Sequence, residues 1–208
     1  MTKVNGPAFS LDASGTLAGT LVFSKWKGRN YIRERVIPSN PKSGGQVGVR
    51  AMFKFLAQNW QNLTAGNQAT WEDRGEDLIA SPFNAFMSLN QTRWRNFQAP
   101  SAEDPAAETG TAPDAATGVA TPGVRSMTLA ITDGANAPDF GYAIFRSLTT
   151  GPTLAFDNCI AVVPWNVGGV TTFIDSPLDP DQYFYNYIGF LETGLRGADG
   201  TECNGTIV

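Results

Sequence analysis

The chain has 208 residues, of which 42% are hydrophobic and 16% are charged. This length allows one large hydrophobic core or two small ones. There is no histidine and there are only two cysteines, which excludes Ser–His and Cys–His catalytic pairs, histidine metal sites and a disulfide framework. The sequence also contains no phosphate-binding loop or dinucleotide-binding motif. We therefore expect no catalytic residue, no cofactor and no metal site.

Charge is distributed unevenly along the chain. Residues 1–100 contain 12 Lys and Arg against 6 Asp and Glu, whereas residues 101–208 contain 3 Arg against 13 Asp and Glu. Such a split is typical of two domains with different surroundings. No apolar run approaches the roughly 20 residues of a membrane-spanning helix, and the first residues lack the apolar core of a signal peptide. We expect synthesis in a cytoplasm and no membrane partner.

Residues 20–37 predict a β-hairpin. Thr20 to Trp26 alternates as a strand does, Lys27-Gly28 supplies a tight turn, and Arg29 to Ile37 forms the return strand. Glycine suits this turn because it adopts positive φ without strain. An isolated hairpin is only marginally stable, so we expect the following helices or another chain to cover one of its faces.

The hairpin carries the densest basic and aromatic cluster in the sequence, and its members are Lys25, Trp26, Lys27, Arg29, Tyr31, Arg33 and Arg35. Two interpretations are open. The cluster is either a solvated strand face with core-facing aromatic rings, or an anchor surface, since Arg and aromatic residues are enriched in well-packed interfaces. Nucleic acid is a weaker candidate partner, because the basic excess is modest and no known binding motif is present.

Three helices are predicted after the prolines that end the hairpin. The first starts at Ser43, which has capping-box spacing with Gln46. Its apolar stripe contains Val49, Met52, Phe53, Leu56, Trp60 and Leu63. The second starts at Thr64 and carries Trp71 inward, and the third starts at Ser81-Pro82.

The apolar stripe of the third helix contains one polar residue, Asn90. We expect a locally satisfied amide there. A hydrogen bond to a neighbouring chain or helix is the alternative.

Residues 98–122 are rich in Ala, Pro, Thr, Gly and acidic residues and contain no aromatic residue, which is typical of a linker. Strand signals then return at 125–132, 141–146, 160–163, 170–174 and 182–190. Short strands at such spacing predict an antiparallel β-sandwich. The predicted organisation is an α+β module of one β-hairpin plus three helices at 1–97, a linker at 98–122, an all-β sandwich at 123–193 and an irregular Gly-rich tail at 194–208.

Two further features of the second half leave alternatives open. Cys159 and Cys203 are expected to be free thiols, and the alternative is a disulfide that ties down the tail. Asp175, Asp179 and Asp181 lie close together in the sequence. We favour a solvated turn over a Ca²⁺ site, because their spacing is not that of an EF-hand loop.

The segment from Asp175 to Tyr185 resembles the late strands of fibronectin type III domains. In those domains a Leu-x-Pro turn precedes a tyrosine that buries its ring and bonds to upstream backbone. Tyr183 matches this tyrosine-corner position. The turn is one residue shorter than the common pattern, and the early strand offers Leu129 and Ile131 in place of the usual buried Trp. The resemblance implies an immunoglobulin/fibronectin-III-like sandwich.

Residues 15–97 resemble a module of uncharacterised virion proteins of tailed bacteriophages. The matching segments are Ser24 to Arg33, Pro38 to Ser43, Gln46 to Arg50, Leu63-Thr64 with Trp71, and Phe83 to Phe86 with Asn90. The resemblance implies a non-enzymatic virion structural protein made in the host cytoplasm. Its partners would be other virion proteins, capsid or tail subunits, and it would form a homo-oligomer in the assembled particle.

Within this class, a head decoration or cement protein that docks through residues 1–97 and displays the acidic sandwich is the preferred hypothesis. A tail or fibre adaptor is the runner-up. A surface module that binds a ligand or glycan through the sandwich is a third hypothesis, and an enzyme is the least favoured.

Overall fold

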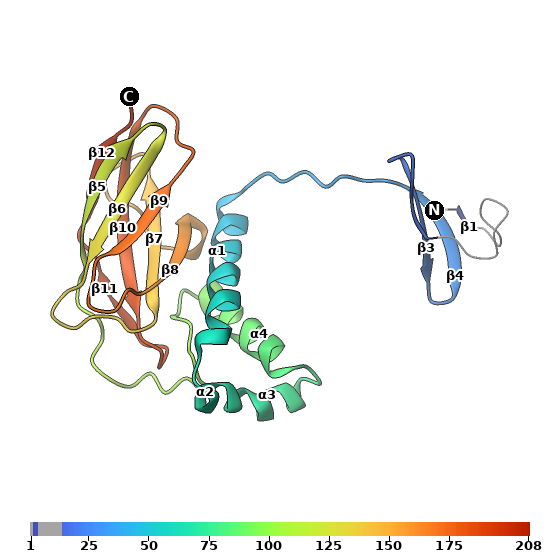
Figure 1. The fold of residues 1–208 in the computed structure, drawn as a ribbon, viewed down its shortest axis with the longest axis horizontal. Coiled ribbons are helices and arrows are strands. Elements are labelled where there is room, and N and C mark those ends of the chain that lie inside the picture. The colour runs from blue at the N-terminus through green and yellow to red at the C-terminus, as the bar shows by residue number, and fades with distance from the viewer. Residues whose placement is uncertain (1, 4–13) are drawn as a thin grey trace. The chain divides into compact units, whose positions relative to one another are not determined.

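The computed structural model describes residues 2–3 and 14–208 (Figure 1). Most of the N-terminal segment in which we found no signal-peptide core therefore lies outside the described residues. The chain forms two compact units, Met1–Pro41 and Lys42–Val208, which are called unit 1 and unit 2 below. The structure thus divides the chain just before the first helix, and not at the predicted linker of residues 98–122.

Unit 1 is a small antiparallel sheet with the strand order β1-β4-β3-β2. The strands are β1 (Thr2–Lys3), β2 (Gly15–Leu17), β3 (Leu21–Trp26) and β4 (Arg29–Glu34). The predicted hairpin turn is confirmed, because Lys27 and Gly28 have φ values of 48° and 76°. Two successive positive φ angles are typical of a type I′ turn, whose twist matches that of the two strands that it connects. The return strand ends at Glu34, earlier than the predicted end at Ile37.

Unit 2 begins with four helices, α1 (Gly44–Asn59), α2 (Ala65–Ala69), α3 (Trp71–Asp77) and α4 (Pro82–Arg95). The predicted caps are present at Thr64, whose hydroxyl accepts from the Asn67 N–H at 3.1 Å, and at Ser81, which accepts from the Asn84 N–H at 3.3 Å. Ser43 occupies the N-cap position of α1 but makes no side-chain cap bond. The second predicted helix is divided in two, because α2 ends before Thr70.

Two antiparallel sheets follow the helices. One has the order β5-β6-β9, with β5 (Thr117–Gly123), β6 (Ser126–Thr132) and β9 (Thr171–Asp175). The other has the order β11-β10-β7-β8, with β7 (Gly141–Ser147), β8 (Cys159–Pro164), β10 (Gln182–Phe190) and β11 (Arg196–Asp199), and β12 (Cys203–Thr206) also pairs with β10. The five predicted strands correspond to β6 to β10. The fold is therefore mixed α+β, with helices and several antiparallel sheets.

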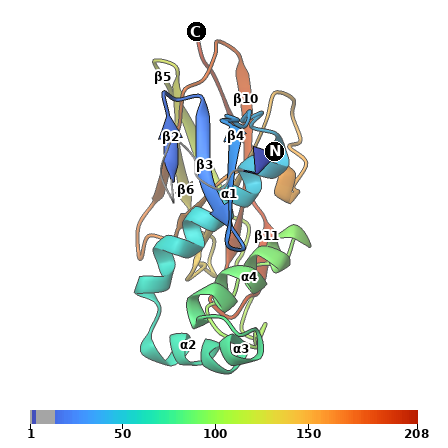
Figure 2. The same cartoon turned by 90° about the vertical axis from the view of Figure 1, so that its right-hand side faces the viewer.

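Strand β7 shows how unit 2 is layered. Tyr142 and Ile144 point into a core between the two sheets, whereas Ala143 and Phe145 point into a second core against the helices. Alternation sends successive side chains to opposite faces, so this strand is buried on both sides. Figures 1 and 2 both show the helices on one face of the two-sheet body. Unit 2 therefore has three layers, with the β11-β10-β7-β8 sheet in the middle.

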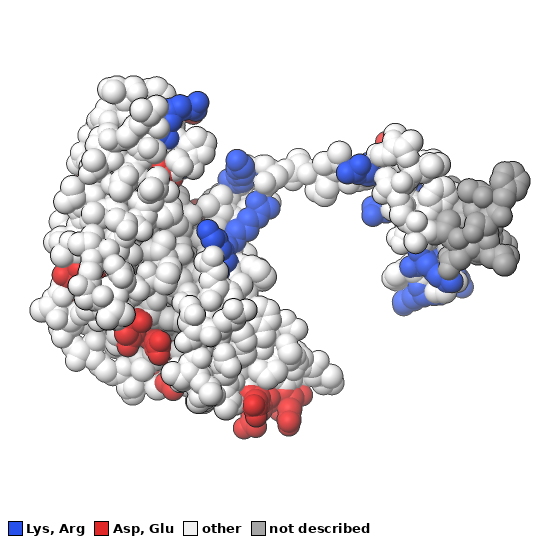
Figure 3. Space-filling model, in the orientation of Figure 1, with Lys and Arg blue, Asp and Glu red and all other residues white. Residues whose placement is uncertain are grey.

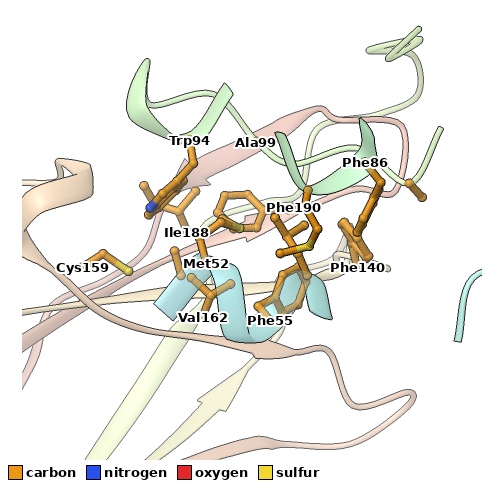
Figure 4. Packing of buried hydrophobic residues seen from close by; sticks show 14 of the residues in the cluster. Met52, Phe55, Phe86, Trp94, Ala99, Phe140, Cys159, Val162, Ile188 and Phe190 are labelled. Atoms are coloured by element: carbon orange, nitrogen blue, oxygen red, sulfur yellow. The ribbon is translucent and has the colours of Figure 1, made fainter. Parts of the chain in front are cut away.

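The core between helices and sheet corrects the prediction that the helices pack on the hairpin. Met52 and Phe55 of α1 and Trp94 of α4 lie in one buried cluster with Ile188 and Phe190 of β10 (Figure 4). The rings of Trp94 and Phe190 meet edge to face with 5.9 Å between centroids. The apolar stripe predicted for α1 is confirmed at Met52, Leu56 and Leu63, which the core of unit 2 buries. Phe53 is instead 53% exposed, and Phe55, which was not among the predicted residues, is buried.

The predicted linker at 98–122 is also wrong for most of its length. Ala99, Ala102 and Ala116 are at most 2% exposed, and residues 117–123 form β5. Asn90 holds this segment, because its amide donates to the Ser101 carbonyl at 2.9 Å and accepts from the Ser101 N–H at 2.7 Å. The amide is thus satisfied by the segment that follows α4, eleven residues later. The small side chains of this segment give it the composition of a linker, but in the structure they allow the segment to pack closely against the rest of unit 2.

The tail at 194–208 is ordered as well, which corrects its prediction as irregular. It contributes β11 and β12 to the sheet through pairing with β10. Ile207 is buried in the core between the sheets. Glycines in this segment face close neighbours, as at Gly197, where a Cβ would lie 2.8 Å from the Pro113 side chain. Its glycine content therefore reflects close packing.

Glycines also set how α1 approaches the sheet. A Cβ at Gly44 would overlap the backbone carbonyl of Asp157, and one at Gly48 would overlap that of Phe156. Both carbonyls belong to a short 3-10 turn, Phe156–Asn158, just before β8. The glycines weaken the intrinsic preference for helix, but they allow the backbone of α1 to contact this turn directly. In the described part of the chain, no helix is long and apolar enough to cross a membrane.

Candidate interaction surface on the unit 1 sheet

The register of the hairpin sorts the seven predicted interaction residues. Trp26 pairs with Arg29, Ser24 with Tyr31 and Val22 with Arg33. Residues that pair directly across two strands share a face, so Trp26, Arg29, Tyr31 and Arg33 lie on the same side. These four residues define the basic–aromatic face. Figure 3 shows Lys and Arg side chains gathered at the turn end of the hairpin.

Three of the seven predicted residues do not belong to the basic–aromatic face. Lys25 pairs with Asn30 on the opposite face. Lys27 is in the turn, where its ammonium lies 4.9 Å from the centroid of the Trp26 ring. Arg35 follows the end of β4, and its backbone N–H donates to the Thr20 carbonyl at 2.6 Å. The structure thus brings four of the residues together, and Lys27 lies beside them.

The basic–aromatic face is open. Trp26 is 66% exposed, and Arg29 and Arg33 are also exposed, while Tyr31 is half-buried. Residues 14–41 contain one acidic residue, Glu34, and it pairs with Leu21 on the opposite face. The face therefore presents two guanidinium groups and two aromatic rings, with no carboxylate among its strand positions. Such a surface suits a partner with carboxylates or other anionic groups, and flat groups that stack on aromatic rings.

Asp133 is the acceptor in a hydrogen-bond network of unit 2. Asp133 accepts from the Tyr142 hydroxyl at 2.6 Å and from the Trp165 indole N–H at 2.8 Å. Burial raises the pKa of Tyr142 well above its ordinary value, and the bond to Asp133 raises it further. The Asp133 carboxylate thus links β7, through Tyr142, to Trp165, which directly follows β8.

Two of the three aspartates that were considered for Ca²⁺ form ion pairs with arginines. Asp175 accepts from Arg146 at 2.8 Å and from the Tyr185 hydroxyl at 3.0 Å, and Asp179 pairs with Arg125 at 2.8 Å. Within residues 2–3 and 14–208, no group of three or more His, Cys, Asp or Glu could hold a metal ion. The solvated-turn interpretation fits Asp179, but Asp175 is buried in an ion pair.

The two cysteines are free thiols, so the alternative of a disulfide to the tail is wrong. Cys159 is buried in the core against the helices, and burial raises its pKa to about 12. Cys203 lies in β12 and contacts the Tyr187 hydroxyl. Burial also raises the pKa of Cys203. Both thiols are therefore poor nucleophiles at neutral pH.

Tyr183 makes the bond that defines a tyrosine corner. Its hydroxyl donates to the Asp179 carbonyl, four residues upstream, at 3.0 Å. Its ring lies in the core between the two sheets, together with Leu178 of the preceding turn. The Arg146 guanidinium lies 5.5 Å from the ring centroid. Tyr183 thus ties the start of β10 to the turn that precedes it.

One groove of about 310 Å³ runs along β8. The side chains that line it come from α1, from β8 and, at Phe173, from β9. Lys54 is the one charged residue in this lining. An apolar groove with a single charge lacks the several convergent polar groups of a specific small-molecule site.

The alternation of the first strand already places Lys25 on one face with Leu21 and Phe23, and places Trp26 on the other face. Reasoning from the sequence missed Leu17, which lies beside Leu21 on the face that carries Lys25. Strand β2 was not predicted, because three residues are too few to show an alternation.

No family model matches the chain, and no curated protein is similar to it. Among solved structures, it is similar to a β-1,2-glucanase from Parabacteroides distasonis, with 14% identity and a TM-score of 0.38 over 48% of this chain and 13% of the glucanase chain. It is also similar to an Fn3-like protein from Clostridium thermocellum, with 18% identity and a TM-score of 0.34 over 47% of this chain and 93% of that chain. At these TM-scores neither similarity carries an argument about function.

Proposed function

We propose that this chain is a non-enzymatic structural protein of a bacteriophage particle, and that it docks on other virion proteins through the basic–aromatic face of unit 1. The observation that carries the proposal is the grouping of Trp26, Arg29, Tyr31 and Arg33 on one exposed face of a sheet that forms a unit of its own. The resemblance of residues 15–97 to phage virion modules supports the assignment to a particle. The docking element is then residues 1–41, which is smaller than the predicted module of residues 1–97.

The chemistry of the face favours a protein partner with an acidic surface. Arginine and tryptophan are the residues that most often dominate binding energy at protein interfaces. Basic groups on one partner and acidic groups on the other steer the encounter and fix its orientation. We infer a capsid subunit as the partner and a head decoration or cement role, with a tail or fibre adaptor as the alternative.

For unit 2 we infer an immunoglobulin/fibronectin-III-like sandwich that carries a helical layer. If β5, β6 and β9 are strands A, B and E, and β7, β10 and β11 are strands C, F and G, the two sheets have the strand membership of this class. The bond from Tyr183 to the Asp179 carbonyl supports the same assignment, since it lies near the start of strand F. The residues that would form a linker between anchor and sandwich are instead part of unit 2, so unit 2 is displayed as one body.

Reconstitution on particles that lack the protein tests the docking proposal. The full chain should bind such particles stoichiometrically, and binding should weaken as salt increases, because salt screens exposed charges. A Trp26→Ala, Arg33→Ala double variant should bind at least about tenfold more weakly. Arg95→Ala is the matched control, since Arg95 is an exposed arginine of α4 in unit 2, and it should bind like the parent chain.

The same experiment separates the alternatives. Binding to tailless heads supports decoration, and binding to isolated tails supports an adaptor. Unchanged binding of the double variant, with loss of binding by variants of unit 2, would refute the anchor assignment. A surface module for ligands or glycans is the third candidate; binding of soluble glycans by the chain without particle binding would favour it.

A further inference from the structure

The groove beside β8 runs along the edge of that strand and not across one of its faces. Its lining includes five successive residues of β8, Ile160 to Pro164. Successive side chains of a strand point to opposite faces of the sheet, so a groove on one face would meet only every second residue. Within residues 2–3 and 14–208, β8 pairs with β7 alone and ends its sheet. The groove therefore follows the unpaired edge of the middle layer.

The backbone of Val162 faces this groove. On the other side of the strand, the Val163 carbonyl points to β7, since a Cβ at Gly141 would lie 2.5 Å from it. The Trp165 N–H also points that way and donates to the Phe140 carbonyl at 3.2 Å. Because bonded and non-bonded positions alternate along an antiparallel pair, the N–H and C=O of Val162 point away from β7. No hydrogen bond from another described residue reaches either group.

Two walls flank this edge. Ala51, Lys54 and Gln58 of α1 line the groove from the helical layer, and Phe173 of β9 lines it from the outer sheet; Figure 1 shows α1 beside β8. Lys54 is exposed and forms no ion pair with a described residue. A single extended segment fits between such walls, whereas β8 of a second copy would bring its own α1 and β9 with it.

We propose that this groove binds an extended segment of a partner protein, which adds to β8 as a further strand and places a carboxylate beside Lys54. In strand addition, main-chain hydrogen bonds supply affinity, and pockets for alternate side chains supply specificity. Proline has no N–H to donate to a further strand, so the pairing ends at Pro164 and the bound segment is short. Unit 1 takes no part in this binding, so the proposal stands if the particle assignment fails.

Amide hydrogen exchange of the full chain, followed by NMR, tests whether the edge is open. In the free chain the Val162 amide should exchange at least about tenfold faster than the Val163 amide, which faces β7. A Val162 amide that is slow at every protein concentration would overturn the proposal, because the edge would be covered within the chain. A Val162 amide that is protected only at high concentration would overturn it as well, because a second copy would be the occupant.

Terminally blocked peptides test the occupant. The probes have the sequence Ac-Ser-Thr-X-Glu-X-Thr-Ser-NH2, where X is valine, leucine or phenylalanine. At least one of them should shift the amide signals of residues 160–163 and slow the exchange of the Val162 amide at least about tenfold at saturation. If none of the three does so at millimolar concentration, the proposal is wrong.

Methylation of the peptide backbone separates strand addition from a purely apolar contact. Alternate N–H groups of a strand point to opposite sides. Of two versions of the best probe, N-methylated at the glutamate or at the residue before it, one should therefore bind like the parent probe and the other should not bind. Equal binding of both versions would show that the peptide does not pair with β8, and would overturn the proposal.

Charge reversal at Lys54 tests the carboxylate. Lys54→Glu should bind the best probe about fivefold more weakly. It should also bind a probe with lysine in place of glutamate more tightly than the parent chain does, which loss of folding cannot produce. Arg95→Glu, at an exposed position of α4, is the matched control and should bind both probes like the parent chain. Equal effects of the two variants would overturn the pairing with Lys54.

Discussion

Two tryptophans summarise the contrast between the units. Trp94 of unit 2 is 1% exposed, its indole N–H donates to the Gly48 carbonyl at 3.2 Å, and its ring meets that of Phe190. Trp26 of unit 1 is 66% exposed, and its close ring partner is the ammonium of Lys27. The same residue type therefore stabilises a fold in one unit and is available to a partner in the other.

The contrast extends to charge. Unit 2 carries an exposed acidic group on α3, formed by Glu72, Asp73, Glu76 and Asp77, which is visible at the end of the helical layer in Figure 3. Unit 1 is basic and has no buried residue between positions 14 and 41. Unit 2 contains two cores that stabilise its fold, whereas the described residues of unit 1 place charged and aromatic side chains at the surface.

The largest expected effect is the difference between two variants, in each of which one of these tryptophans is replaced by alanine. Trp94→Ala should lower the free energy of unfolding of unit 2 by about 3 to 5 kcal/mol, because it empties a space at the centre of a core. Trp26→Ala should change the same quantity by less than about 0.5 kcal/mol, as is usual for exposed side chains. Urea denaturation, monitored by far-UV circular dichroism, measures the free energy of unfolding of both variants. Equal losses for the two variants would remove the contrast.

A smaller effect is expected where α1 contacts the 3-10 turn. Gly48→Ala should destabilise unit 2 by about 2 kcal/mol, because the new Cβ would overlap the Phe156 carbonyl and both segments must shift. Gly45→Ala is the matched control in the same helix. Its Cβ would lie 3.8 Å from the Phe156 ring, which is ordinary contact, so alanine should be neutral or stabilise the helix slightly. A harmless Gly48→Ala would show that the backbone contact is dispensable.

The smallest effect concerns Glu192. Burial raises its pKa above the ordinary 4.5, and Asp139 raises it further, while the hydrogen bond from Asn67 opposes the shift. A raised pKa in the folded state means that this group stabilises the fold below its ordinary pKa and that this contribution is lost as the pH rises through the folded pKa. Glu192→Gln should therefore be more stable than the parent at pH 7, and the advantage should disappear near pH 4.

Urea denaturation at the two pH values checks the sign of this effect. Glu76→Gln, at an exposed position of α3, should follow the parent at both. A Glu192→Gln variant that is less stable than the parent at pH 7 would contradict the prediction, and would mean that the bond to Asn67 outweighs burial.

Much of unit 2 could be predicted from local pattern. The strands β6 to β10 and the helix starts at Thr64 and Ser81 follow from alternation and capping, which act over a few residues. The strands β5, β11 and β12 were missed, because Ala-rich and Gly-rich segments carry no alternation of large side chains. Asn90 was the available signal for the segment after α4, since a buried amide on a helix stripe needs partners. The sequence could not identify Ser101 as that partner.

The candidate surface was predicted in part. The turn at Lys27-Gly28 and the alternation of the two strands follow from the sequence, and they place Trp26 and Arg33 on the hairpin. The alternation also separates Lys25 from Trp26, whereas the position of Leu17 beside Leu21 depends on β2, which the sequence did not indicate. The sequence by itself therefore determined the elements whose signals are local, together with the basic character of residues 1–41. Only the tertiary structure decided that the helices belong to the sandwich, because their apolar stripes can pack on any apolar surface, and the sheet of β7, β8 and β10 is the one that covers them.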